Sequence, residues 1–324
     1  MIRRILIMIN NCVADKALQW IKNNTIDGHG ITITSKQKRV YPEVTGYYIP
    51  TLLNIGEENL AIAYAKYLCN IQKENGAWYD AYDNYPYVFD SAQILKGLVA
   101  IEKKLPNVKY NIEKGCDWLL SNMDESGRLK PAISDCFAED TTVYSELIHL
   151  YCLTPLIDAG KLLNKPEYAV AVEKIKRYYL ENYKHDILNF SLLSHFYAYV
   201  MEGLVDLGEK EIIRTAMNNI EKYKDENGAI PGLYDVKWVC STGLFQLAIV
   251  WYKLNEVEKG NRLFEYACSL QNSSGGWFGS YSISFANKYF TRKRKKAWYF
   301  PKEEIAWANK YYFDALLLHD KLNK

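Results

Sequence analysis

The sequence predicts an all-α protein folded as an (α/α)6 toroid, a ring of six helical hairpins, in a single domain spanning residues 1–324. Apolar residues recur with helical periodicity along most of the chain, and the alternating runs that indicate strands are almost absent. A unit of about 45 to 65 residues also repeats, pairing an amphipathic helix with a more apolar helix across a glycine-containing turn. Apolar helices inside and amphipathic helices outside would bury the core of such a ring.

The glycine-containing turns are the clearest part of this repeat. Residues 72–78 and 271–277 both read Gln-x-x-x-Gly-x-Trp, and weaker versions lie at 125–129 and 226–232. Glycine just past a helix supplies the left-handed conformation that ends it, and the apolar residue that follows folds back on the last turn. These turns are therefore predicted to end the amphipathic helix of each pair.

Each predicted hairpin has an amphipathic first helix, placed outside, and a more apolar second helix, placed inside. The alternative is an open helical solenoid, which tolerates unequal repeats and usually has capping ends. In chain order the predicted pairs are 11–23 with 42–55, 58–72 with 89–104, 110–122 with 141–160, 166–182 with 192–207, 209–224 with 239–254, and 257–270 with 303–320.

Composition narrows the class of ligand. A net charge of +2 argues against nucleic-acid binding, which needs a basic face for phosphates. The 27 Tyr and 8 Trp suit a cavity that receives sugar rings, although packing between helices uses aromatic residues too. The basic run at 292–296 is interpreted as a solvated loop, with an acidic ligand or an anionic membrane surface as the alternative.

No metal or cofactor is expected. The seven cysteines are scattered without a CxxC pair, and the five histidines include no HxxxH pair. Neither GxGxxG nor GxxxxGK[ST] follows a predicted strand. The apolar run near residue 5 is too short for a signal peptide, and no stretch approaches the roughly 20 apolar residues of a membrane span. We therefore expect a cytoplasmic protein without a transmembrane segment.

The inner helices carry polar residues in their first turns, beginning with Tyr41–Pro50. Because inner helices of a toroid run parallel, these first turns are expected to meet at one mouth of the ring. Unpaired backbone N–H groups there also favour polar ligands. The candidate catalytic residues are Glu43, Asp90 and His195, and the candidate substrate-binding residues are Tyr41, Thr45, Tyr47, Gln93, Tyr144, Trp238, Gln246, Trp307 and Lys310.

Glu43 and Asp90 form the best carboxylate pair in the sequence. In glycosidic chemistry one such group protonates the leaving oxygen while the other activates water or attacks carbon. Both residues lie at helix starts, however, where an acid also caps free N–H groups, and Phe89-Asp90-Ser91 reads well as an N-cap. His195 is a candidate base among apolar neighbours, with a structural core position as the alternative. The long interval 280–301 is predicted to be a lid.

The Gln-x-x-x-Gly-x-Trp turns resemble those of prenyltransferase and squalene-cyclase type α/α barrels. More specifically, segments 41–53, 89–98, 240–248 and 307–316 resemble bacterial surface-polysaccharide biosynthesis proteins of the VpsJ type. That family is similar in architecture to six-hairpin glycosidases, uronate lyases and glucuronyl epimerases. The resemblance implies work on carbohydrates and covers nearly the whole chain, but it does not name a reaction.

We therefore expect a protein that acts on an oligosaccharide or lipid-linked glycan during surface-polysaccharide assembly, by hydrolysis, elimination or epimerisation. A non-catalytic glycan-binding or scaffold subunit of an assembly complex is the main alternative. A prenyl or terpenoid enzyme is a third, although the sequence lacks the DxDD motif of terpene cyclases.

Overall fold

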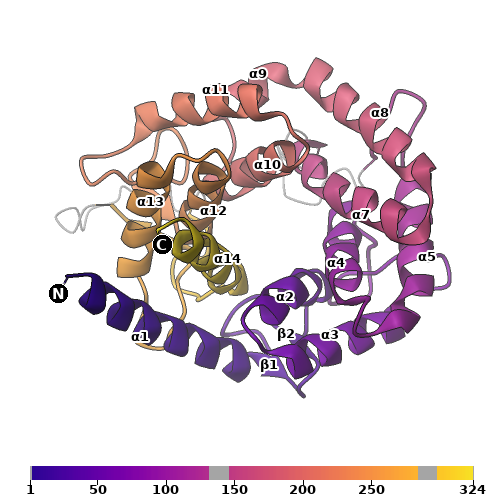
Figure 1. The fold of residues 1–324 in the computed structure, drawn as a ribbon, viewed down its shortest axis with the longest axis horizontal. Coiled ribbons are helices and arrows are strands. Elements are labelled where there is room, and N and C mark those ends of the chain that lie inside the picture. The colour runs from indigo at the N-terminus through magenta and orange to yellow at the C-terminus, as the bar shows by residue number, and fades with distance from the viewer. Residues whose placement is uncertain (1, 131–145, 284–297, 324) are drawn as a thin grey trace.

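The computed structural model describes residues 2–130, 146–283 and 298–323, and it is built almost entirely of helices in two concentric rings (Figure 1). The outer ring contains α1 (Ile2–Asn23), α3 (Glu58–Ile71), α5 (Lys109–Ser121), α8 (Pro166–Asn182), α11 (Lys210–Ile220) and α13 (Val257–Ser269). The inner ring contains α2 (Pro42–Asn54), α4 (Val88–Ile101), α7 (Leu153–Leu163), α10 (Ser194–Asp206), α12 (Ser241–Lys253) and α14 (Ala306–Leu322). Shorter helical segments are η1 (Pro106–Val108), η2 (Ile148–Cys152), α9 (Lys184–Leu188) and η3 (Glu221–Tyr223).

The ring is closed. Each inner helix packs against the next one along the chain, and the last, α14, packs against both α12 and α2 (Figure 1). Helix α14 also contacts α1, so the two ends of the chain meet within one ring. This arrangement confirms the predicted (α/α)6 toroid and excludes the open solenoid.

The structure corrects several predicted boundaries. The third inner helix was expected at 141–160, but residues 131–145 lie outside the described part, and α7 follows the 3-10 turn η2. Two small antiparallel strand pairs were not predicted: β1 (Thr25–Ile26) with β2 (Gly30–Ile31), and β3 (Trp238–Cys240) with β4 (Ser280–Ser282). Because β3 pairs with the distant β4, α12 begins at Ser241 instead of 239.

The Gln-Gly-Trp turns join neighbouring outer helices. Gly76 has the predicted left-handed backbone, with φ +93°, and a Cβ there would lie 2.3 Å from the carbonyl oxygen of Lys114. The prediction that it ends α3 is wrong, because the extended backbone of Gln72 ends that helix and Gly76 belongs to the turn that follows. The amide of Gln72 donates to the carbonyls of both Gly76 and Asn111, each at 2.9 Å, which ties this turn to α5. The indole of Trp78 donates to the carbonyl of Leu68 at 2.7 Å, near the end of α3.

The same set of contacts closes the ring. Gln271 donates to the carbonyls of Gly275 at 3.1 Å and Val13 at 2.9 Å, and Trp277 donates to Ala267 at 2.8 Å. Since Val13 lies on α1, the last outer helix is tied to the first as α3 is tied to α5. The motif that identified the repeat is therefore a structural device that links one outer helix to the next.

Two glycines allow the inner helices α2 and α4 to pack closely. A Cβ on Gly46 would lie 2.5 Å from Cα of Ile94, and a Cβ on Gly97 would lie 2.1 Å from the carbonyl oxygen of Gly46. Real side chains essentially never approach so closely, so only glycine fits at this contact. Because the backbones touch here, the first turns of α2 and α4, which carry Glu43 and Asp90, are held side by side.

No helix within the described ranges is both long and apolar enough to cross a lipid bilayer.

We predict that Gly97→Ala destabilises the fold. The added methyl group overlaps the carbonyl oxygen of Gly46, and overpacking of this kind typically costs about 1–3 kcal/mol, which exceeds the roughly 1 kcal/mol that alanine gains from helix propensity. Urea denaturation measures the difference, with Lys66→Ala on the exposed face of α3 as control. Equal midpoints for the Gly97 variant and the wild type would contradict the close α2 to α4 contact.

Candidate functional site

Glu43 faces the other inner helices and does not cap its own helix. It follows Pro42 in the first turn of α2, and only 3% of its surface is exposed. Burial raises its pKa well above the ordinary value, and the neighbouring Asp90 carboxylate raises it further. A hydrogen bond with the Trp307 side chain and the positive charge of Lys310 act in the opposite direction. The net effect favours the protonated acid, the form that a general acid requires.

Asp90 lies beside Glu43, on the first turn of α4. Helix α4 begins at Val88 after Tyr87, whose side chain makes no capping bond, so the N-cap interpretation of Asp90 is wrong. Its carboxylate instead accepts a hydrogen bond of 3.0 Å from the hydroxyl of Tyr41. Burial raises its pKa to about 7, with a further contribution from Asp80, although the Tyr41 hydrogen bond lowers it. The carboxyl can therefore release or accept a proton near neutral pH.

His195 is buried yet has a polar partner. Its Nδ1 lies 2.6 Å from Oε1 of Gln246 on the adjacent inner helix α12. An amide oxygen only accepts, so this assignment places the proton on Nδ1 and leaves a lone pair on Nε2. Burial lowers the pKa of the ring to about 3, which keeps the histidine neutral. A neutral imidazole with a lone pair on Nε2 can accept a proton or a hydrogen bond, although the lowered pKa makes this ring a weak base.

Aromatic side chains surround these titratable groups. The Trp307 ring, itself partly exposed, lies 6.0 Å from that of His195, 6.3 Å from Tyr299 and 6.2 Å from Phe300. Tyr199 packs 4.5 Å from His195 on the buried side. Partly exposed aromatic faces beside hydrogen-bonding groups suit the apolar and polar sides of a sugar ring.

Several buried polar atoms near the inner-helix starts have no hydrogen-bond partner in the described part of the chain. They include Oε1 of Gln93, Oγ1 of Thr242, Nε2 of Gln246 and Nε1 of Trp238. An unpaired buried polar group costs about 1–3 kcal/mol, so native proteins rarely leave several together without water or a ligand to satisfy them. Trp238 belongs to β3, where its ring stacks on Trp298 at 5.8 Å.

Lys310 and Tyr47 lie within the ring and contact each other. The Lys310 ammonium is 2.7 Å from Asp314, and it lies 3.7 Å from the ring centre of Tyr311 and 5.1 Å from that of Tyr47. Lys310 is 1% exposed and Tyr47 is fully buried. The ion pair and the ring faces offset the free-energy cost of burying the Lys310 charge. That positive charge lowers the pKa values of both Glu43 and His195.

The structure gives other predicted residues different surroundings. The hydroxyl of Thr45 accepts from the backbone of Ile31 at 3.1 Å and donates to the carbonyl of Tyr41 at 2.8 Å, so it ties β2 to the start of α2. Tyr144 and the basic run 292–296 lie outside the described residues, as does most of the predicted lid at 280–301.

Sequence reasoning missed part of the aromatic surroundings. Phe196, Tyr299 and Phe300 were not singled out, although the structure places them around His195 and Trp307. The only signal for Tyr299 and Phe300 was the aromatic content of the interval 280–301. As for metals, no group of three or more His, Cys, Asp or Glu side chains in the described part of the chain is arranged to hold one.

No protein-family model and no curated protein matches this sequence. Solved structures do match its fold. An unsaturated glucuronyl hydrolase specific for heparin is 14% identical, with TM-score 0.69, covering 98% of this chain and 97% of that one. A D-mannose isomerase is 11% identical, with TM-score 0.71, covering 97% of each chain.

A type II terpene cyclase from Scytonema is 10% identical, with TM-score 0.62, covering 97% of this chain and 99% of the other. At such identities these likenesses establish the fold alone. The chain has the (α/α)6 toroid fold, which it shares with these solved structures. The finer resemblance to VpsJ-type proteins stays a prediction.

We predict that Asp90 makes stability depend on pH. The pKa of this carboxyl is about 7 in the folded protein and about 4 in the unfolded chain. Between these pH values the group ionises mainly in the unfolded chain, and this ionisation stabilises the unfolded state relative to the folded state. The free energy of unfolding should therefore fall by a few kcal/mol between about pH 4 and pH 7 through this group. Urea denaturation at several pH values tests this.

The Asp90→Asn variant is the reference for that measurement, because it cannot ionise at this position. The unfolding free energy of the wild type minus that of the variant should decrease as the pH rises. Glu43 gives a contribution of the same sign that remains in the variant. A difference that stays constant from pH 4 to pH 7 would contradict the raised pKa.

Proposed function

We propose that the protein is a carbohydrate-modifying enzyme that cleaves or alters a glycosidic or uronic unit by acid/base catalysis. The observation that carries this proposal is the pair of buried carboxyls, Glu43 and Asp90, on the adjoining first turns of two inner helices. Both have raised pKa values, and partly exposed aromatic rings lie nearby. The similarity in fold to an unsaturated glucuronyl hydrolase and a D-mannose isomerase supports a sugar substrate.

Hydrolysis is the reaction that a carboxyl pair supports best. Glu43, held in its acid form, would protonate the leaving oxygen of a glycosidic bond. Asp90 would then act in its ionised form, either activating water or attacking the sugar carbon, and its pKa of about 7 leaves a large ionised fraction at neutral pH. Trp307 and the neighbouring rings of Tyr299 and Phe300 would stack on the sugar faces.

The neutral His195 favours proton abstraction as a second candidate reaction. Elimination or epimerisation begins when a base removes a proton from carbon beside a carbonyl or carboxylate group. Nε2 of His195 carries the lone pair that this role needs, with Glu43 returning a proton, but burial lowers the pKa of the ring to about 3 and so makes it a weak base. The VpsJ-type resemblance supports an oligosaccharide or lipid-linked glycan of surface-polysaccharide assembly as the substrate. The scattered cysteines, which show no pattern of a disulfide framework, favour a cytoplasmic location.

We predict that Glu43→Gln abolishes turnover without destabilising the protein. The amide cannot donate an acidic proton, so the rate should fall about 100-fold or more. Because Glu43 favours its neutral form, a neutral amide of the same shape should leave the melting temperature nearly unchanged. A panel of polysaccharide fragments supplies the substrates.

Three readouts separate the reactions: new reducing ends report hydrolysis, absorbance of an unsaturated uronate reports elimination, and deuterium incorporation from solvent reports epimerisation. Glu58→Gln, at the exposed first turn of the outer helix α3, is the matched control and should keep full activity. Wild-type turnover by the Glu43 variant would refute the assignment. Glycan binding without turnover by the wild type would favour the non-catalytic subunit instead.

A further inference from the structure

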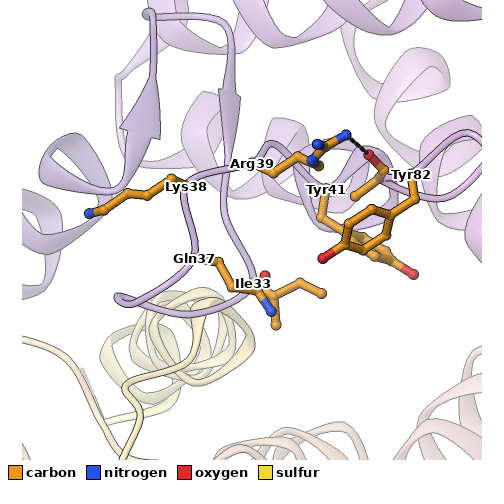
Figure 2. Close-up of a pocket in the computed structure, with 7 residues that line it drawn as sticks. Ile33, Gln37, Lys38, Arg39, Tyr41 and Tyr82 are labelled. Atoms are coloured by element: carbon orange, nitrogen blue, oxygen red, sulfur yellow. Dashed lines mark hydrogen bonds between the residues drawn. The ribbon is translucent and has the colours of Figure 1, made fainter.

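A cavity of about 350 Å³ lies beside Tyr41, among the loops that precede α2 and α4. Figure 2 shows it between residues 33–41 and residues 81–82. Its volume falls in the range of small-ligand sites, roughly 300–1,000 Å³. The cavity is lined by Ile33, Gln37, Lys38, Arg39, Tyr41, Ala81 and Tyr82.

Tyr41 connects this cavity with the proposed catalytic site. Its ring lines the cavity, and its hydroxyl donates to Asp90 at 3.0 Å. A ligand in the cavity would therefore lie one side chain away from the carboxyl pair. A chain of sugar units can extend over that distance, with one unit at the carboxyls and the next in the cavity.

Arg39 is an exposed side chain that contacts the facing loop and keeps donors available. Its Nη1 donates to the carbonyl of Ala81 at 3.1 Å, and its guanidinium carbon lies 4.9 Å from the ring centre of Tyr82. Figure 2 shows these two side chains together, while the amino group of Lys38 extends away from them. A guanidinium has five N–H donors, so this one hydrogen bond to the described residues leaves most of the fork available to a ligand.

No carboxylate in the described part of the chain forms an ion pair with Arg39. The two acids on the facing loop are engaged elsewhere: Asp80 accepts from the backbone of Tyr82 at 2.9 Å and of Asn84 at 3.0 Å, and Asp83 pairs with Lys73 at 2.7 Å. The positive charge at the cavity therefore lacks a protein partner among these residues, and it suits an anionic ligand.

We propose that this cavity is a subsite for a sugar unit that carries a carboxylate, which makes the substrate of the proposed enzyme an acidic oligosaccharide. Arginine binds a carboxylate through two parallel N–H bonds, a mode that it also uses for phosphates, and the single charge of a uronate matches the single guanidinium here. The ring of Tyr82 is 66% exposed and would pack against the sugar face. The proposal rests on the proposed function for the position of the neighbouring sugar unit, but it concerns binding alone.

Calorimetric binding to the full-length Glu43→Gln variant tests the proposal without interference from turnover. The probes are short oligosaccharides of galacturonate, of glucuronate and of mannuronate, each beside its carboxyl-reduced neutral counterpart. At least one acidic probe should bind about tenfold or more tightly than its neutral counterpart, because one charge-assisted bidentate contact is lost on reduction. Adding Arg39→Gln should remove that preference.

Lys66→Gln, which removes a charge from the exposed face of α3, is the control and should keep the preference. Equal affinity for acidic and neutral probes, no binding of any acidic probe, or an unchanged preference in the Arg39 variant would each overturn the subsite. A phosphorylated sugar that binds more tightly than every uronate would overturn the carboxylate assignment.

These outcomes are separate from those of the proposed function. Suppose that the preference for acidic probes depends on Arg39 but the Glu43 variant turns over substrate like the wild type. This result would support the subsite and contradict the catalytic assignment. Loss of turnover in the Glu43 variant without any preference for acidic probes would support the catalytic assignment and contradict the subsite.

Discussion

The close contact between α2 and α4 determines the chemistry of the candidate site. Gly46 and Gly97 let the two backbones touch, and this contact brings the first turns of both helices together inside the ring. Two carboxyls that would each be ordinary in water are thereby buried side by side, where water no longer stabilises their charges. Their raised pKa values follow from helix packing, before any feature of a ligand is considered.

Charged groups inside the ring balance this acidic pair. Lys310 pairs with Asp314 at 2.7 Å, and the hydroxyl of Thr51 donates to the same carboxylate at 2.7 Å. Although burial opposes it, Lys253 and Lys96 lower the pKa of Glu202 to about 2. The inner helices are thus not simply apolar. The positive charge of Lys310, held by its ion pair with Asp314, lowers the pKa of Glu43 and so limits the rise that burial causes.

The features that were predicted correctly from the sequence depend on residues that lie close together in the chain. The helical repeat and the left-handed glycines of the Gln-Gly-Trp turns depend on residues a few positions apart, and the structure confirms both. These glycines lie beyond the helix ends, however, at Gln72 for α3 and Leu270 for α13, so the prediction that they end the outer helices is wrong. The pairing of β3 with β4 depends on residues some forty positions apart, and it was missed. The contact of Glu43 with Trp307 spans most of the chain, so only the closed ring reveals it. Asp90 was misread as a possible cap because helix starts are uncertain by a residue or two.

The pKa of Glu43 tests the central claim most directly, because the account depends on a buried acid coupled to Asp90. Titration of the selectively labelled Glu43 carboxyl by carbon-13 NMR, in wild type and in Asp90→Asn, measures it. We expect a wild-type pKa well above that of an exposed glutamate, and a lower value in the variant that still exceeds the ordinary one, since burial remains. An ordinary pKa in the wild type, or the same value in both proteins, would contradict the account.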